Sequence, residues 1–88
     1  MKKMSKVLVK LYVPALEAKY DMKLPLNRNM YEVIKLLISL INEINEGVYN
    51  PSSFPMLYNK STGKMFDINL SVKDNNIING SELVLIWF

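Results

Sequence analysis

The strongest pattern in this chain is one amphipathic helix, about residues 30–46, with strand patterns before and after it. Apolar residues recur there at helical intervals, from Met30 to Ile44, and polar residues collect on the opposite side. Leu36 and Leu40 widen the apolar stripe beyond a narrow seam. A helix of this kind has to bury its apolar side, so we expect it to lie flat across a sheet.

Both ends of this helix carry sequence signals. Asn29 is a favourable N-cap residue, and Glu32, three positions later, completes a pattern close to a capping box. Gly47 stands where a glycine in the left-handed conformation commonly ends a helix. These signals predict a helix that begins after Asn29 and stops near Gly47.

Alternating apolar and polar residues predict an antiparallel hairpin before the helix. In Lys6–Val13 every second residue, from Val7 to Val13, is apolar and faces one side. Pro14 breaks this run, because proline cannot donate a hydrogen bond to a strand ladder. The alternation resumes over Lys19–Leu24, and two such runs joined by a short link indicate a hairpin.

After the helix the elements are shorter. Val48–Pro55 reads as a loop because of its prolines and serines. Met56–Tyr58 and Lys64–Phe66 flank a turn containing Gly63, which predicts a second, shorter hairpin. A mostly polar crossover then leads to a final apolar strand, Glu82–Trp87.

Composition limits the class of protein. A length of 88 residues, half of them apolar and 22% charged, fits a single globular domain, residues 1–88. The absence of cysteine removes disulfides and thiolate metal sites. The start of the chain lacks the apolar core of a signal peptide, and no stretch is apolar enough for membrane insertion. We therefore expect a cytoplasmic location.

The order of elements resembles the ubiquitin-like β-grasp fold, an α+β fold with a mixed sheet of four to five strands packed on one helix. The stretch from Val72 to Leu83 is similar to the segment of ubiquitin-like proteins that joins an apolar anchor to the last strand through polar turns. Conjugated members act through a C-terminal Gly-Gly, whereas this chain ends in Leu85-Ile86-Trp87-Phe88. The resemblance therefore implies a protein that is not conjugated.

Among relatives without the Gly-Gly tail, the chain is similar to the YukD/EsaB proteins of Gram-positive bacteria. The features that carry this are the turn Ile77-Ile78-Asn79-Gly80 before the last strand, the segment Tyr20–Pro25, and an end close to the final strand. The resemblance implies a cytoplasmic accessory or regulatory component of a type VII (ESX-type) secretion system. It also implies protein partners, including components of the secretion machinery.

The residue types that carry most enzyme chemistry are missing. The chain has no histidine and no cysteine, and its eight carboxylates are dispersed. Gly63-Lys64 lacks the spacing and the strand–loop–helix setting of a phosphate-binding loop. We expect no enzymatic activity, no cofactor and no metal site.

The parity of the last strand predicts an interaction surface. If Leu83 and Leu85 pack on the helix, then the residues between them face outward, and an outward apolar patch commonly marks an interaction site. Two alternatives stay open, namely a second copy of the chain or the loop Val48–Pro55 as the cover of this face. Trp87 and Phe88 also have two possible roles, in the core or at the interface. The candidate residues are Leu8, Lys10, Tyr12, Leu57, Val84, Ile86 and Phe88.

A second function follows from the charge of the chain. The net charge is +3, and four lysines cluster near the start of the chain, namely Lys2, Lys3, Lys6 and Lys10. A basic segment of this kind is compatible with a small regulatory protein that binds nucleic acid. The other lysines are scattered, which favours a solvated surface over nucleic-acid binding.

Overall fold

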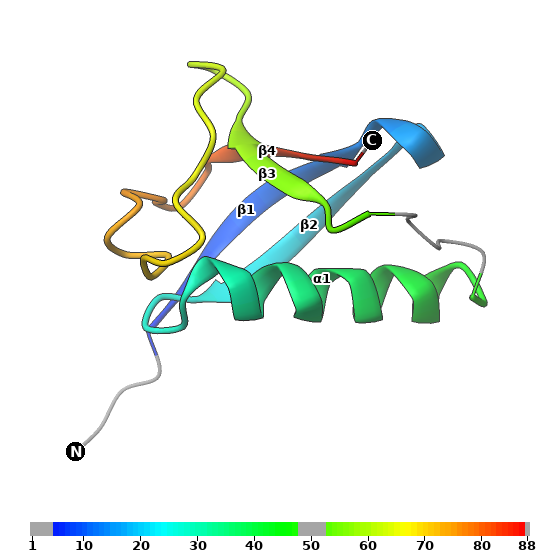
Figure 1. Ribbon diagram of the computed structural model, residues 1–88, viewed down its shortest axis with the longest axis horizontal. Helices are drawn as coiled ribbons and strands as arrows, with labels where there is room; N and C mark the ends of the chain where they lie inside the picture. Colours follow the sequence, from blue (N-terminus) through cyan, green and yellow to red (C-terminus); the bar gives the residue numbers. More distant parts are fainter. Residues whose placement is uncertain (1–4, 48–52, 88) are drawn as a thin grey trace.

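The computed structural model describes residues 5–47 and 53–87, in which one helix lies against one face of a four-stranded mixed sheet (Figure 1). This arrangement confirms the predicted ubiquitin-like β-grasp. The elements are β1 (Lys6–Val13), the short 3-10 helix η1 (Pro14–Leu16), β2 (Ala18–Pro25), α1 (Met30–Ile44), β3 (Met56–Asn59) and β4 (Glu82–Ile86).

The last strand lies in the middle of the sheet, as predicted. The strand order is β2-β1-β4-β3, so β4 has a neighbour on each side. It runs parallel to β1, with Leu11 beside Leu83, and antiparallel to β3, with Leu57 beside Leu85. A central strand is shielded along both edges, which suits the continuous apolar run of β4.

The predicted first hairpin is confirmed over its whole length. The strands β1 and β2 pair antiparallel from Lys6 opposite Pro25 to Val13 opposite Ala18. Pro14 begins the turn of η1, and Glu17 follows it in the left-handed conformation, with φ of 50°. The proline therefore ends β1, and the chain reverses within four residues of it.

The helix begins as predicted and ends one residue differently. The side chain of Asn29 accepts a hydrogen bond from the backbone N–H of Glu32 at 3.0 Å. At the other end, the N–H of Gly47 donates to the carbonyl of Asn42 at 2.7 Å, which is the long bond of a Schellman motif. Gly47 is left-handed as predicted, with φ of 81°, but Glu46 before it is left-handed too, with φ of 55°, so the first left-handed position is occupied by a residue with a side chain.

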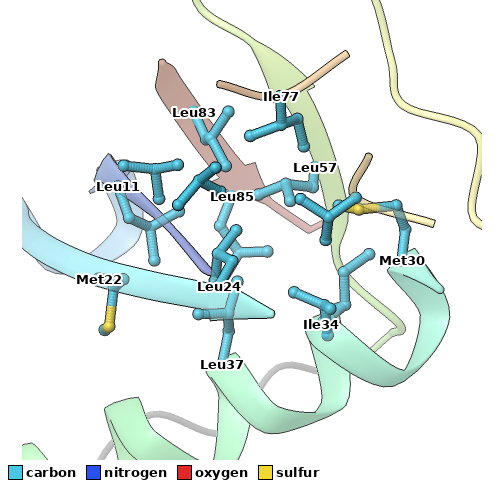
Figure 2. Packing of buried hydrophobic residues seen from close by; sticks show 14 of the residues in the cluster. Leu11, Met22, Leu24, Met30, Ile34, Leu37, Leu57, Ile77, Leu83 and Leu85 are labelled. Carbon is cyan, nitrogen blue, oxygen red and sulfur yellow. The ribbon is translucent and has the colours of Figure 1, made fainter. Parts of the chain in front are cut away.

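The core lies between the helix and one face of the sheet. Figure 2 shows Met30, Ile34 and Leu37 of α1 pointing toward leucines of the strands. Ile77, from the crossover before β4, closes the same cluster. The largest fully buried side chains are Leu11, Met30, Ile34, Leu37, Ile41, Leu57, Leu83, Leu85, Val9, Val13 and Val33.

Two residues of the helix do not join this core. Leu36 is 45% exposed and Leu40 is 43% exposed, so the apolar stripe is wider than the face that the sheet covers. The expectation that the whole widened stripe would pack on the sheet was therefore wrong for these two residues. Ile44 continues this uncovered stripe with 57% exposure.

The predicted second hairpin is reduced to a single bridge. Only Tyr58 and Met65 pair, and Lys64–Phe66 does not continue as a strand. The N–H of Asn59 donates to the carbonyl of Lys64 at 2.9 Å, which closes the turn. Beyond it, the side chain of Asn75 accepts a hydrogen bond from the N–H of Asp67 and donates one to its carbonyl. Local amide bonds of this kind compete with strand pairing in a polar segment.

Candidate protein-interaction surface

The face of the sheet that points away from the helix carries most of the predicted interaction residues. Along β1 the side chains of Val7, Val9 and Leu11 are buried under the helix, and the residues between them point to the other side. Leu8 on this second side is 47% exposed. We call this second side the outer face.

A row of side chains crosses the outer face from strand to strand. Tyr12 of β1 lies beside Val84 of β4, and Val84 lies beside Tyr58 of β3. Val84 is only 6% exposed, although it does not belong to the cluster under the helix. The two half-buried tyrosines that flank it on the same face explain this burial.

A second pair extends this row toward the far end of β4. Ile86 and Met56 are partners across β4 and β3, and both are half-buried. We call the apolar residues of the outer face the outer patch. Its members are Leu8, Tyr12, Met56, Tyr58, Val84 and Ile86.

Charged side chains border the outer patch on one side. A hollow of about 270 Å³ is lined by Lys10, Lys19 and Lys60, together with Glu82 and Tyr12. Lys10 also lies 3.9 Å from Asp21, but both side chains are exposed, and an ion pair in this setting stabilises by about 0–1 kcal/mol. The hollow therefore presents mostly free positive charge next to aromatic surface.

The structure brings five of the seven predicted residues together on this face. They are Leu8, Lys10, Tyr12, Val84 and Ile86. Phe88 lies outside the described residues. Whether these side chains bind a partner stays a prediction.

The placement of Leu57 was wrong. This residue is 2% exposed and pairs with Leu85 in the core, so it faces the helix. Its neighbour Tyr58 takes the outward position. Three consecutive apolar or aromatic residues, Met56-Leu57-Tyr58, give no alternation from which the parity of β3 could be read.

Sequence reasoning also missed Met56, Tyr58, Lys19 and Lys60. The pairing of β3 with β4 brings the first two to the outer face, and no signal within β3 itself could have placed them. Lys19 lies opposite Tyr12 in the first hairpin, and the predicted alternation of that hairpin could have placed it.

The loop Val48–Pro55 was one of the two alternatives for covering the outer face, and the structure describes part of it. Residues 48–52 of the predicted loop lie outside that part. Phe54 stacks on Tyr31 of the helix, with ring centroids 5.0 Å apart, so the described end of the loop lies beside α1. Trp87 is half-buried against the core cluster and so belongs to the helix side.

The described residues offer little for other kinds of site. Among residues 5–47 and 53–87 no three metal-ligating side chains of His, Cys, Asp or Glu gather. No helix in these residues is long and apolar enough to cross a bilayer.

Comparison with solved structures shows the ubiquitin-like fold. The ubiquitin-like domain of EccD1, a type VII secretion system protein of Mycobacterium tuberculosis, is 16% identical, with a TM-score of 0.74 over 94% of this chain and 99% of that one. The EccD5 ubiquitin-like domain from Mycobacterium xenopi is 18% identical, with a TM-score of 0.76 over 96% of each chain.

The same fold occurs in a different setting. A chain of a toluene 4-monooxygenase HD complex is 11% identical, with a TM-score of 0.78 over 96% of this chain and 100% of that one. No protein-family model and no curated protein matches the sequence. At these identities the comparisons establish the fold, and the surface has to supply the argument for function.

Proposed function

We propose that the chain is a non-conjugating ubiquitin-like module that binds a protein partner through the outer patch. The observation that carries this proposal is the row of Tyr12, Val84 and Tyr58 across the outer face, in which both tyrosines stay partly exposed. Aromatic residues at the centre of a patch with a charged rim are typical of protein interfaces.

The secretion setting is the finer part of this proposal. The similarity to ubiquitin-like domains of two type VII secretion proteins supports a cytoplasmic accessory or regulatory role in such a system. The features shared with YukD/EsaB proteins point in the same direction. The partner would then be a component of the secretion machinery.

A capture experiment with one altered side chain tests the proposal. Ile86→Asp places a charge in the outer patch at a half-buried position, and Leu70→Asp places one at a 41% exposed position next to the N-terminus of α1. We expect wild type and Leu70→Asp to recover the same secretion components from an extract, and Ile86→Asp to lose them. Equal recovery by a folded Ile86→Asp protein would exclude this face.

Nucleic-acid binding stays as the second candidate because Lys6, Lys10, Lys19 and Lys23 alternate onto the outer face with Lys60. Binding of this kind weakens steeply as salt is added, because phosphate contacts release counterions. A fluorescence titration with DNA and RNA at low and high salt distinguishes it. No binding at low salt would remove this candidate.

A further inference from the structure

We infer that two copies of this chain associate through the free edge of β2, with Lys19 of each copy opposite Asp21 of the other. The inference goes beyond the proposed function, because it concerns the edge of the sheet and not the outer patch. Three features of the described residues carry it, namely the open edge, its charge order and the exposed flank of the helix beside it.

The edge at β2 is open, whereas the edge at β3 is occupied. Beside β3, Met65 pairs with Tyr58, and the N–H of Phe66 donates to the carbonyl of Leu57 at 3.0 Å. β2 is eight residues long and has β1 on one side only. A long open edge strand is a template for pairing with another chain.

The hydrogen bonds of β1 show which groups of β2 face this open edge. Lys10 donates to Ser81 and Leu8 accepts from Gly80, so the even-numbered residues of β1 point their backbone groups toward β4. The odd-numbered residues of β1 therefore bond to their partners in β2, which are even-numbered. The backbone groups of Lys19, Asp21 and Lys23 point outward, and none bonds to another segment in residues 5–47 and 53–87.

In one register of two β2 strands, charged residues of one copy lie opposite residues of opposite charge in the other copy. In an antiparallel pair of two β2 strands with Tyr20 on the two-fold axis, Lys19 lies opposite Asp21 of the second copy, and the same pair recurs on the other side of the axis. Both residues have free N–H and C=O groups, so each pair can exchange both backbone hydrogen bonds. The register also brings Glu17 of the second copy toward Lys23.

Neighbouring registers are less favourable. A shift that places Asp21 opposite Asp21 also places Lys19 opposite Lys23, and like charges directly opposite each other destabilise a strand pair. The opposite shift places Lys19 opposite Lys19 and Asp21 opposite Glu17, so like charges again lie opposite each other. One further step in the first direction places Asp21 opposite Lys23, but it also places Lys19 opposite Pro25, which has no N–H to donate. The charge order of β2 thus selects one register and favours a second copy as the occupant.

The helix presents an apolar flank on the same side of the molecule. Tyr31 stacks on Phe54, which leads into β3, so this flank of α1 faces the β3 edge. Successive helical residues turn by about 100°, which places Leu36 and Leu40 on the opposite flank, toward β2. Together with Ile44 they form the exposed stripe, and a second copy related by the two-fold axis would cover it with its own stripe.

Pairing of this kind makes one continuous sheet with both outer patches on the same side. The dimer would therefore present two binding surfaces in a fixed arrangement, which strengthens binding to a partner that has repeated sites. The contact uses one edge strand and one helix flank per copy. We expect a weak dimer, since such an interface lies below the standard size for stable complexes.

Sedimentation over a concentration series tests the dimer itself. Wild type should change from monomer to dimer between about 10 µM and about 1 mM, the range that fits an interface of this size. In the same series, amide exchange at Lys19 and Asp21 should slow as dimer forms, because their N–H groups become bonded. A protein that remains monomeric at about 1 mM would overturn the inference.

Charge exchange tests the register. Lys19→Glu and Asp21→Lys should each weaken dimerisation about tenfold or more, since each places like charges opposite each other twice. The double variant K19E/D21K exchanges the two charges and should restore dimerisation to within about threefold. Lys60→Glu, near the other end of the hollow, is the matched control and should leave the dimer unchanged. A folded double variant as weak as either single variant would contradict the register.

One further variant tests the dimer at a second position and distinguishes failure of the dimer from failure of the proposed function. Leu40→Asp lies on the exposed flank, so it should weaken dimerisation about tenfold without touching the outer patch. Leu40→Asp should still recover the partner, whereas Ile86→Asp should still form the dimer. If Leu40→Asp leaves dimerisation unchanged, the helix flank is not part of the interface and the inferred arrangement is wrong.

Discussion

The two faces of the sheet differ in how completely they are closed. On the helix side, Leu83 and Leu85 are fully buried, whereas on the outer face Val84 is 6% exposed and Ile86 is half-buried. One strand therefore serves both the core and a surface. The difference teaches that an apolar run can mark a partly open face as well as a core.

The largest expected effect on stability is at Leu57. A side chain buried under the helix predicts a large loss on truncation, whereas one on the outer face predicts a small loss. Leu57→Ala should destabilise the protein by about 2–5 kcal/mol, as a fully buried leucine leaves a cavity under the helix. Chemical denaturation measures this free energy of unfolding. A loss below about 0.5 kcal/mol would contradict burial under the helix and indicate that Leu57 lies on the outer face.

Val84 is an intermediate case, because it is nearly buried but lies on the outer face. Val84→Ala removes two methyl groups that are packed between tyrosines and not under the helix. We expect a loss of about 1–2 kcal/mol, because the side chains around it can move into the space more freely than in a closed core. Thermal unfolding of Val84→Ala and Leu57→Ala compares the two losses of stability. Equal losses would show that the outer face is packed as tightly as the core under the helix.

The end of the helix that covers the inner face can be strengthened. Glu46 has φ of 55°, a conformation that glycine adopts without steric cost. Glu46→Gly should therefore raise the free energy of unfolding by about 0.5–1 kcal/mol. Glu43→Gly, inside the helix, is the control and should lower it by a similar amount. Destabilisation by Glu46→Gly would show that the side chain of Glu46 has a favourable contact.

The smallest effect is expected at Leu8. Leu8→Lys changes a 47% exposed residue on the outer face, so the free energy of unfolding should stay within about 0.5 kcal/mol of wild type. Partner binding should nevertheless weaken, because a charge enters the outer patch. A large loss of stability would mean that the outer face is a second core.

The sequence predicted the parts of the fold that have a regular pattern. The alternation of β1 and β2, the N-cap at Asn29 and the central position of β4 are all confirmed. Periodicity of this kind fixes both the type of element and the face that it buries.

Other features depend on contacts that no local pattern encodes. The inward position of Leu57 is set by its pairing with Leu85, and the 43% exposure of Leu40 does not follow from its place in an apolar stripe. The expected second hairpin is limited to one bridge, and the segment after it is held by the side chain of Asn75, eight positions from Asp67. Most of the outer face could be predicted from β1 and β4, but the contribution of β3 could not.

Photo-crosslinking from two tyrosine positions tests most directly whether the outer face binds the partner. A photoreactive residue in place of Tyr58 lies in the outer patch, and one in place of Tyr31 lies on the helix, where the side chain is 45% exposed. We predict a crosslinked partner from position 58 and none from position 31, with adducts between two copies separated by mass. Crosslinking from position 31 alone would contradict the account and assign binding to the helix side.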